Sequence, residues 1–146
     1  LRAEGHWLVG RLLLDRILSE APNVGAVGGL TLGADPIASA VSMASWMAAR
    51  PLEAFLVRKE AKGHGTKRWL EGPALPAGLP VAIVEDVVTT GGSGLLAAQK
   101  AREAGLEVLG IFALVDRLEG GREAVEAEGL RLHSLFDRRD FLGEEH

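Results

Sequence analysis

Hydrophobic residues follow two different spacings along the chain, one typical of helices and the other of buried strands. Between residues 8 and 18, apolar residues recur three and four positions apart, which predicts an amphipathic helix that ends before Pro22. Residues 24–27 and 81–84 are instead short apolar runs, and the second consists mainly of β-branched residues. Such runs are expected of strands that are buried on both faces of a sheet. The chain therefore contains both kinds of element.

The rest of the sequence continues to alternate strands with helices. We expect further strands at residues 53–57, 107–115 and 130–135, and further helices at 37–49, 95–104, 121–128 and 137–142. Pro36 suits the first position of its helix, with Asp35 as the expected N-cap. This alternation predicts right-handed βαβ units and an α/β fold: a doubly wound, mainly parallel five-stranded sheet flanked by helices. The loops that follow the strands then meet at one edge of the sheet.

The composition indicates a single domain that covers residues 1–146. Hydrophobic residues make up 47% of the chain and charged residues 25%, the ordinary balance of a globular protein. The formal net charge of −4 argues against nonspecific binding of nucleic acid. Cysteine is absent, which suits a cytoplasmic protein, and no apolar run approaches the ~20 residues of a membrane span. We expect a cytoplasmic protein that binds neither nucleic acid nor membranes.

Two carboxylates and a glycine- and threonine-rich loop follow the strand at residues 81–84. Glu85 and Asp86 come at the end of this strand, where open α/β sheets place their ligands. Residues 89–93 offer unhindered backbone N–H groups, three hydroxyl groups and the start of a helix at Ser93, which together suit a phosphate group. Taken singly, each part also fits a solvated strand end or an ordinary turn into a helix. Together they predict an acid pair beside an anion-binding loop.

Five cationic residues lie within the eleven residues that follow the strand at 53–57. They are Arg58, Lys59, Lys62, Lys67 and Arg68. A charge run of this kind is usually a solvated surface loop. Gly63 and Gly65 flank His64, however, so a side chain that titrates near neutral pH lies between two conformationally free positions. We therefore expect residues 58–71 to form a mobile lid that brings cations over an anionic ligand.

These motifs carry a resemblance to a known family. The strand, acid pair and Thr-Thr-Gly-Gly-Ser loop resemble the phosphoribosyl pyrophosphate signature of the type I phosphoribosyltransferases. Residues 58–65, which read RKEAKGHG, are similar to the catalytic loop of the orotate phosphoribosyltransferase family, and Arg117 matches that family's arginine for the orotate carboxylate. The likeness extends over residues 28–117. It implies the type I phosphoribosyltransferase fold and an enzyme that makes orotidine 5′-monophosphate and pyrophosphate in pyrimidine biosynthesis.

The resemblance also implies roles for individual residues. It makes Arg58, Lys59, Lys62, His64 and Asp86 the catalytic residues. Phosphoribosyl pyrophosphate would contact Arg58, Lys59, Lys62 and His64 of the lid. It would also contact the residues of the strand end and loop: Glu85, Asp86, Val87, Val88, Thr89, Thr90, Gly91, Gly92 and Ser93. Orotate would be held by Thr89 and Arg117. Mg²⁺ is the expected cofactor, held mainly through pyrophosphate and ribose and not directly by protein residues.

The same resemblance gives two further expectations and one difference from the family. The protein should be a homodimer in which Arg58, Lys62 and His64 act in the neighbouring subunit's site, while Lys59 serves its own. Most members have an N-terminal hood that supplies a further lysine, whereas this chain begins almost at its first core helix, so we expect the hood to be missing. Members often carry a lysine in the pyrophosphate loop, where residues 31–36 read TLGADP.

Two other functions of the same fold stay open from the sequence. A phosphoribosyltransferase for another base would share the donor loop, and a transcription regulator that senses phosphoribosyl pyrophosphate would share the fold without needing the lid. Lys62 and His64 are both present, and the net charge is acidic. These features favour an enzyme over a regulator.

Overall fold

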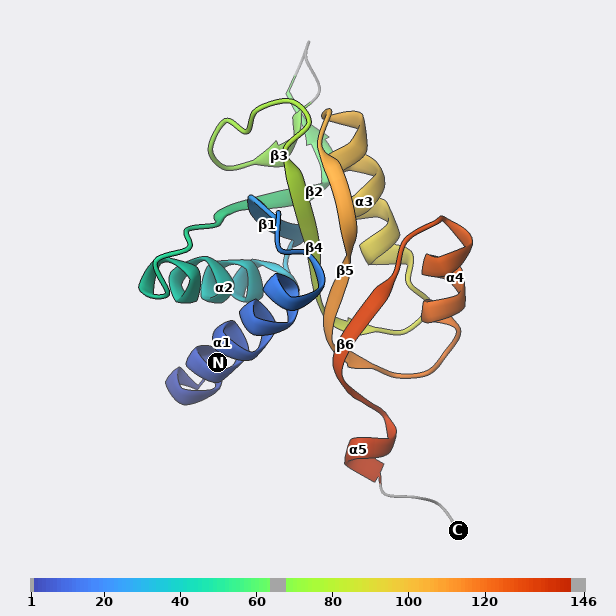
Figure 1. The fold of residues 1–146 in the computed structure, drawn as a ribbon. Helices are drawn as coiled ribbons and strands as arrows, with labels where there is room; N and C mark the ends of the chain where they lie inside the picture. The colour runs from blue at the N-terminus through green and yellow to red at the C-terminus, as the bar shows by residue number, and fades with distance from the viewer. Residues whose placement is uncertain (1, 64–67, 143–146) are drawn as a thin grey trace.

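Six strands form one sheet in the computed structural model, which describes residues 2–63 and 68–142 (Figure 1). The strands are β1 (Ala26–Leu30), β2 (Glu53–Lys62), β3 (Arg68–Glu71), β4 (Pro80–Val88), β5 (Glu107–Asp116) and β6 (Leu132–Asp137), in the order β3-β2-β1-β4-β5-β6. All neighbours pair in parallel except β2 and β3, which are antiparallel. The predicted fold class is confirmed, with one strand more than the five expected.

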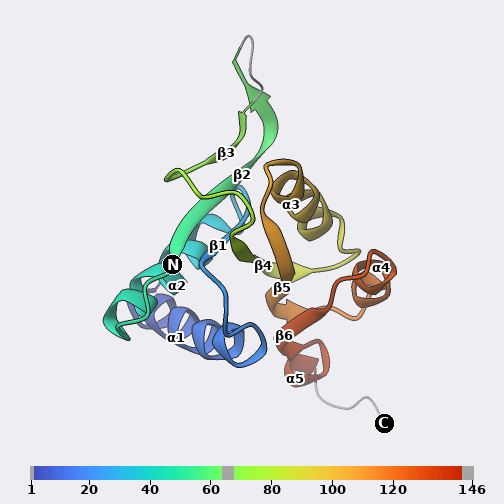
Figure 2. The ribbon, with the colours of Figure 1, turned by 45° about the horizontal axis from the view of Figure 1, so that its top comes forward.

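Helices cover both faces of the sheet (Figures 1 and 2). The helices α1 (Ala3–Glu20) and α2 (Asp35–Met47) lie on one face, α3 (Gly92–Glu103) and α4 (Gly121–Ala127) lie on the other, and α5 (Arg139–Leu142) follows β6. The chain leaves the adjacent strands β1 and β4 toward opposite faces, and a doubly wound sheet opens a crevice at such a point. No helix within the described residues is long and apolar enough to span a membrane.

Side chains of β4 alternate between the two hydrophobic cores of the molecule. Val81 and Ile83 pack in the core under α3, whereas Ala82 and Val84 pack in the core under α1 and α2. All four side chains are fully buried, which explains why this run contains no polar residue. Because successive side chains of a strand point to opposite faces, the two carboxylates that follow emerge on different sides of the sheet.

Some element boundaries differ from those expected. β4 and β2 run past the apolar residues that predicted them, to Val88 and Lys62, because pairing with β5 and β3 continues the ladders. β3 itself was not expected. The prediction that Asp35 caps α2 is wrong: Ala34 holds the N-cap position, and Asp35 lies in the first helical turn.

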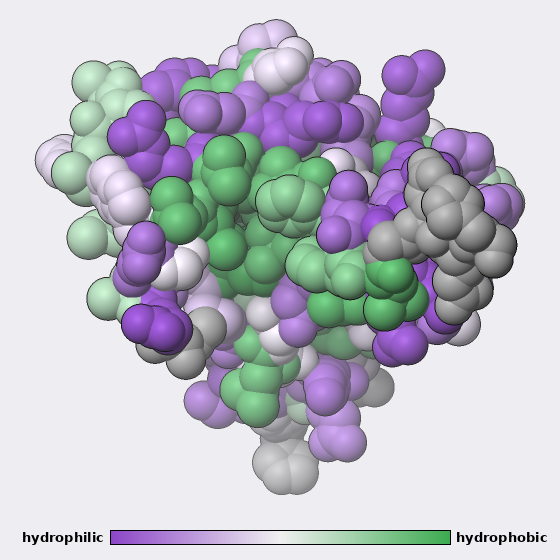
Figure 3. Space-filling model, turned by 90° about the horizontal axis from the view of Figure 1, so that it is seen from below, coloured by the Kyte–Doolittle hydropathy of each residue, from purple (hydrophilic) through white to green (hydrophobic). Residues whose placement is uncertain are grey.

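Several large hydrophobic side chains stay exposed. On α1 they are Trp7, Leu8 and Leu12, and on α2 they are Met43, Trp46 and Met47. Figure 3 shows the molecule from below. Hydrophobic side chains gather at a hollow in the centre of this face, and hydrophilic side chains lie around them. Contiguous apolar surface of this kind is uncommon on monomeric proteins and marks candidate contact surfaces.

Candidate active site

The loop between β4 and α3 (residues 89–91), called the phosphate loop after the ligand predicted there, borders a cavity of about 320 Å³. The residues that line it are Leu30, Glu85, Val87, Val88, Thr89, Thr90, Gly91, Gly92, Ser93, Gly94 and Leu96. All residues predicted between 85 and 93 to bind the donor line this cavity, except Asp86. α3 begins at Gly92, so the N–H groups of its first turn, which have no partner within the helix, lie at the cavity wall. The helix dipole adds partial positive charge there, which suits this wall to bind an anion.

Glycines allow this loop to turn tightly and to pack closely. Gly91 has φ 89°, a left-handed conformation that side chains with a Cβ rarely adopt. A methyl group on Gly121, at the start of α4, would lie 2.8 Å from the carbonyl oxygen of Thr89. The start of α4 therefore packs directly against the outer side of the phosphate loop.

Glu85 is a buried carboxylate of the cavity. Its exposed fraction is 6%, and its Oε2 atom has no hydrogen-bond partner among the described residues. Burial, and secondarily the charge of Asp86, raises the pKa of Glu85 to about 7. Buried polar atoms are normally hydrogen-bonded, so this oxygen is suited to accept a hydrogen bond from a ligand hydroxyl.

Asp86 lies on the other face of β4. Its Oδ1 atom accepts a hydrogen bond of 2.8 Å from the N–H of Val87. A methyl group on Gly33 would come within 3.0 Å of the same oxygen, so the loop after β1 lies against this carboxylate. Asp86 also lines a second, mainly apolar cavity of about 320 Å³ with residues of α1 and α2. The two carboxylates thus line two different cavities at the edge of the sheet.

The loop after β1 forms the opposite side of the crevice. The Thr31 hydroxyl donates a hydrogen bond of 2.9 Å to Asp35 Oδ2, and the Thr31–Leu32 peptide bond is cis. No residue of this loop is cationic. This loop therefore supplies no positive charge to an anionic ligand.

The predicted lid begins and ends as a two-stranded arm. Residues 58–62 belong to β2 and residues 68–71 to β3, and the ends of these strands extend beyond the rest of the molecule (Figure 2). His64 and Lys67 lie outside the described residues. None of the described cations Arg58, Lys59 and Lys62 lines the cavity at the phosphate loop.

Within this arm, Arg58 pairs with Glu71 across the two strands. The Arg58 Nε–H donates to Glu71 Oε1 at 2.7 Å, and its Nη2 contacts the same oxygen. The hydrogen bond and the charge of Arg58 lower the pKa of Glu71. In this conformation, the charge of Arg58, the first cation of the predicted lid, is thus neutralised by Glu71.

Arg117 lies beside the phosphate loop. Its backbone N–H donates a hydrogen bond of 3.0 Å to the carbonyl oxygen of Val88, the residue before Thr89. Its side chain is exposed and pairs with Glu119 at 3.2 Å. Exposed ion pairs contribute only about 0–1 kcal/mol, so a ligand carboxylate can replace Glu119 at small cost. The structure therefore brings together the two residues predicted to hold orotate.

Comparison with known proteins shows which family has these features. The orotate phosphoribosyltransferase of Sorangium cellulosum (strain So ce56) is 54% identical over 143 residues, which cover 97% of this chain and 74% of that protein. The chain belongs to the orotate phosphoribosyltransferase family. This confirms the family and the enzyme class that the motifs predicted. No family model matches the chain.

Solved structures of orotate phosphoribosyltransferases share the fold. The crystal structure of the Mycobacterium tuberculosis H37Rv enzyme in complex with Fe(III) dicitrate has a TM-score of 0.87 and 44% identity, covering 99% of this chain and 78% of that one. The same enzyme in complex with 5-phospho-α-D-ribosyl 1-diphosphate has a TM-score of 0.83 and 41% identity, covering 95% and 76%. The mixed, mainly parallel sheet is therefore that of the orotate phosphoribosyltransferases.

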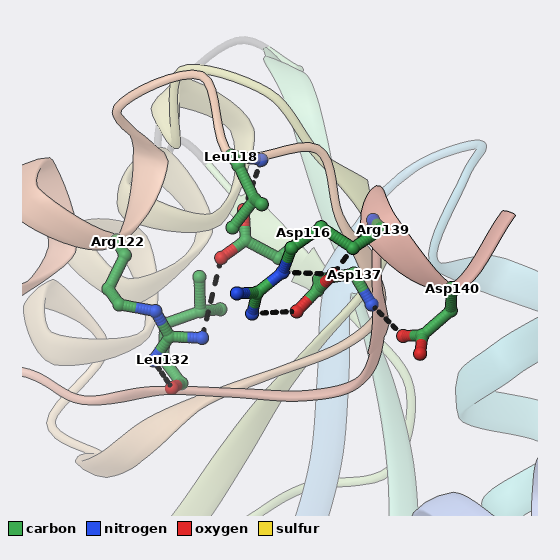
Figure 4. Close-up of polar contacts among 7 residues, drawn as sticks. All are labelled: Asp116, Leu118, Arg122, Leu132, Asp137, Arg139 and Asp140. Atoms are coloured by element: carbon green, nitrogen blue, oxygen red, sulfur yellow. Dashed lines mark hydrogen bonds and ion pairs between the residues drawn. The ribbon is translucent and has the colours of Figure 1, made fainter. Parts of the chain in front are cut away.

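Two polar residues at the edge of the site were not identified from the sequence. Glu71 pairs with Arg58, and Arg122 donates hydrogen bonds to Asp116 and to the carbonyl oxygen of Leu132 (Figure 4). In the sequence, Arg122 reads as an exposed residue of a short helix. The only available signal was Asp116, because a carboxylate at the end of a buried strand needs a partner.

Proposed function

We propose that the chain transfers ribose 5-phosphate from phosphoribosyl pyrophosphate to orotate, as a cytoplasmic step of pyrimidine biosynthesis. The observation that carries this proposal is the cavity at the phosphate loop, where a helix N-terminus lies beside the buried carboxylate of Glu85. A sugar phosphate needs both features, since its phosphate accepts hydrogen bonds and its hydroxyls donate them. The complex of the related Mycobacterium tuberculosis enzyme with this donor supports the assignment.

The 5′-phosphate is placed at the start of α3. Backbone N–H groups of the first turn and the hydroxyls of Thr89, Thr90 and Ser93 would donate hydrogen bonds to its oxygens. Gly91 and Gly92 leave these N–H groups unobstructed, because they carry no side chain. The loop therefore positions the donor by many weak contacts that need no cationic residue.

The acid pair is assigned to the ribose. Displacement of pyrophosphate from C1 develops positive charge on the sugar, which nearby carboxylates stabilise. Glu85 would accept a hydrogen bond from a ribose hydroxyl on the α3 side of β4, and Asp86 would act from the opposite side.

Orotate is assigned to Thr89 and Arg117. The planar guanidinium of an arginine can bind a carboxylate through two parallel hydrogen bonds, which gives specificity as well as affinity. Orotate is already an anion, so the site needs a positioned cation more than a strong base. The exposed position of Arg117 next to the phosphate loop supports this role.

The leaving pyrophosphate requires several positive charges. The carboxylate and hydroxyl oxygens of the crevice are the hard donors that Mg²⁺ prefers. Within residues 2–63 and 68–142, however, no group of three or more His, Asp or Glu side chains could hold a metal ion. We propose that Mg²⁺ is held mainly by pyrophosphate and ribose oxygens, where it neutralises the charge of the leaving group. Arg58, Lys59, Lys62 and His64 of the lid would contact the same group.

We also propose a homodimer whose lids act in trans. The arm formed by β2 and β3 extends away from the rest of the chain, and its described cations do not line the chain's own cavity (Figure 2). The outer side of α2 is apolar, with Met43, Trp46 and Met47 all more than half exposed. A second copy would bury this surface by two-fold symmetry. Both features support an assembly of two chains.

Pyrophosphate release tests the activity directly. The purified chain is incubated with phosphoribosyl pyrophosphate, Mg²⁺ and one base at a time: orotate, uracil, adenine or xanthine. We expect release with orotate and little with the other three bases. Release with a purine but not with orotate would contradict the assigned base. Tight donor binding without release from any base would favour a sensor of the donor over an enzyme.

A further inference from the structure

A partly buried ion pair connects the two ends of the turn that contains the residue proposed to bind orotate: the Asp116 side chain is 1% exposed and the Arg122 side chain 40%. Asp116 is the last residue of β5 and is fully buried. Its Oδ1 atom accepts a hydrogen bond of 2.9 Å from the N–H of Leu118, and its Oδ2 atom lies 3.3 Å from Arg122 Nη2 (Figure 4). One carboxylate therefore holds both ends of the turn that contains Arg117.

The same pair ties this turn to the neighbouring strand. Arg122 Nη1 donates a hydrogen bond of 2.6 Å to the carbonyl oxygen of Leu132, the first residue of β6. The backbone carbonyl of Asp116 accepts a hydrogen bond of 2.9 Å from the N–H of Arg138. Arg122 thus joins the start of α4 to the end of β5 and the start of β6.

The backbone around Arg117 is fixed on both sides. Before it, pairing of Asp116 with Val88 continues the ladder between β4 and β5, and the N–H of Arg117 itself binds the Val88 carbonyl. After it, Leu118 has φ 58°, a conformation that is uncommon for a leucine. The hydrogen bond from Leu118 to Asp116 stabilises this conformation. The direction in which the Arg117 side chain leaves the loop therefore depends on Asp116.

We propose that Asp116 and Arg122 are positioning residues for the base site: the pair fixes the turn 116–122 so that the Arg117 guanidinium faces the orotate carboxylate. This inference rests on the proposed role of Arg117. Neither residue of the pair lines the phosphate cavity. Gly121 of the same turn packs against the phosphate loop, but β4 and α3 also anchor this loop. We therefore expect loss of the pair to affect the base more than the donor.

Steady-state kinetics of Arg122→Ala in the full chain test the proposal. We expect the orotate KM to rise about tenfold, which corresponds to about 1.4 kcal/mol, while the KM for phosphoribosyl pyrophosphate changes less than about twofold. Asp116→Asn, which keeps the shape but removes the charge, should shift the orotate KM in the same direction. Arg131→Ala is the matched control, because this exposed arginine lies next to β6 and outside the network.

The outcomes separate this inference from the proposed function. In one outcome, Arg117→Ala raises only the orotate KM, whereas Arg122→Ala raises both KM values equally or neither of them. The pair is then merely structural, and the proposed role of Arg117 stands. If Arg117→Ala leaves the orotate KM unchanged, the role of Arg117 fails and this inference fails with it. Should Arg122→Ala not fold, as judged by circular dichroism, Arg122→Gln takes its place with the same expected and contradicting results.

Discussion

Glu85 is a buried carboxyl group, 6% exposed, so its ionisation opposes folding. Its pKa is about 7 in the folded chain against an ordinary value of 4.5, because burial and the charge of Asp86 favour the neutral form. The resulting stabilisation is fully present below pH 4.5 and is lost as the pH rises through 7. Glu85→Gln stays neutral throughout. Between pH 5 and 8, the free energy of unfolding of the wild type should therefore fall relative to that of Glu85→Gln.

Urea denaturation of both proteins at a series of pH values measures this difference. Asp15→Asn, which alters an exposed carboxylate of α1, serves as the control and should follow the wild-type profile. Parallel profiles for the wild type and Glu85→Gln would show that Glu85 keeps an ordinary pKa in the folded chain.

Asp86 gives a prediction for the donor. The carboxylate is proposed to accept a hydrogen bond from ribose, and a hydrogen bond to a charged group contributes about 1.5–3 kcal/mol. Asp86→Asn should therefore weaken the binding of phosphoribosyl pyrophosphate roughly tenfold or more. Isothermal titration calorimetry with donor and Mg²⁺ measures the affinity. A dissociation constant within error of the wild-type value would exclude Asp86 from the ribose site.

Arg117 gives a prediction for the base. Arg117→Ala removes the cation assigned to the orotate carboxylate. Because a charge-assisted hydrogen bond is then lost, the orotate KM should rise at least roughly tenfold. The donor KM should change little, because the phosphate loop keeps all its contacts. Initial rates at varied orotate and donor concentrations measure both constants. A loss of activity with an unchanged orotate KM would make the residue structural.

Residues in contiguous motifs could be identified from the sequence, whereas residues defined by tertiary pairing could not. Glu85 and Asp86 stand out because they end an apolar run, yet nothing short of the strand geometry shows that they point to opposite faces. Arg122 and Glu71 acquire their roles only through Asp116 and Arg58, which lie 6 and 13 positions away. Such partners leave no local pattern.

The same distinction applies to whole elements. β4 was predicted because its apolar run is buried on both faces, so burial dictates the residue types. β3 was not predicted, since its four residues RWLE show no alternation and form a strand only by pairing with β2 at the edge of the sheet. Edge strands are less constrained in sequence because one side of the ladder stays open.

The arm formed by β2 and β3 yields a prediction at this scale. Lys62 is exposed at the end of β2 and should be cleaved by trypsin in the chain without ligand. Phosphoribosyl pyrophosphate with Mg²⁺ should slow cleavage at Lys62, because ordering of the lid over the leaving group would shield this bond. Mass spectrometry of timed digests follows the product. Cleavage at the exposed Arg139 on α5, outside the proposed donor site, serves as the internal control, and an unchanged rate at Lys62 would argue against closure.

At the scale of the whole molecule, the topology of the sheet brings the loops that carry the candidate site residues to one edge. Strand order reverses between β1 and β4, so the loops after these strands diverge to opposite faces and leave a crevice between them. This arrangement followed from the alternation of strands and helices. The exposed apolar side of α2 could not be foreseen, because Met43, Trp46 and Met47 occur at spacings that equally suit a buried helix face.

If the lids act in trans in a homodimer, two inactive variants should restore activity when they are mixed. Lys62→Ala should be inactive because its lid lacks a cation. Arg117→Ala should be nearly inactive when the orotate concentration is far below its raised KM. When the two inactive proteins are mixed, a hybrid dimer contains one site with an intact lid and an intact base pocket, while its other site has neither. Random exchange gives half hybrids with one good site of two, so about a quarter of wild-type activity should return.

Native mass spectrometry of the mixture provides the control for this experiment, because it reports the fraction of hybrid dimers directly. Activity should rise in proportion to that fraction as the subunits exchange. Two copies of Lys62→Ala carrying different mass labels should exchange equally well and stay inactive. If hybrids formed without any return of activity, Lys62 would act within its own subunit, and the arm would have to fold back over the cavity of the chain that carries it.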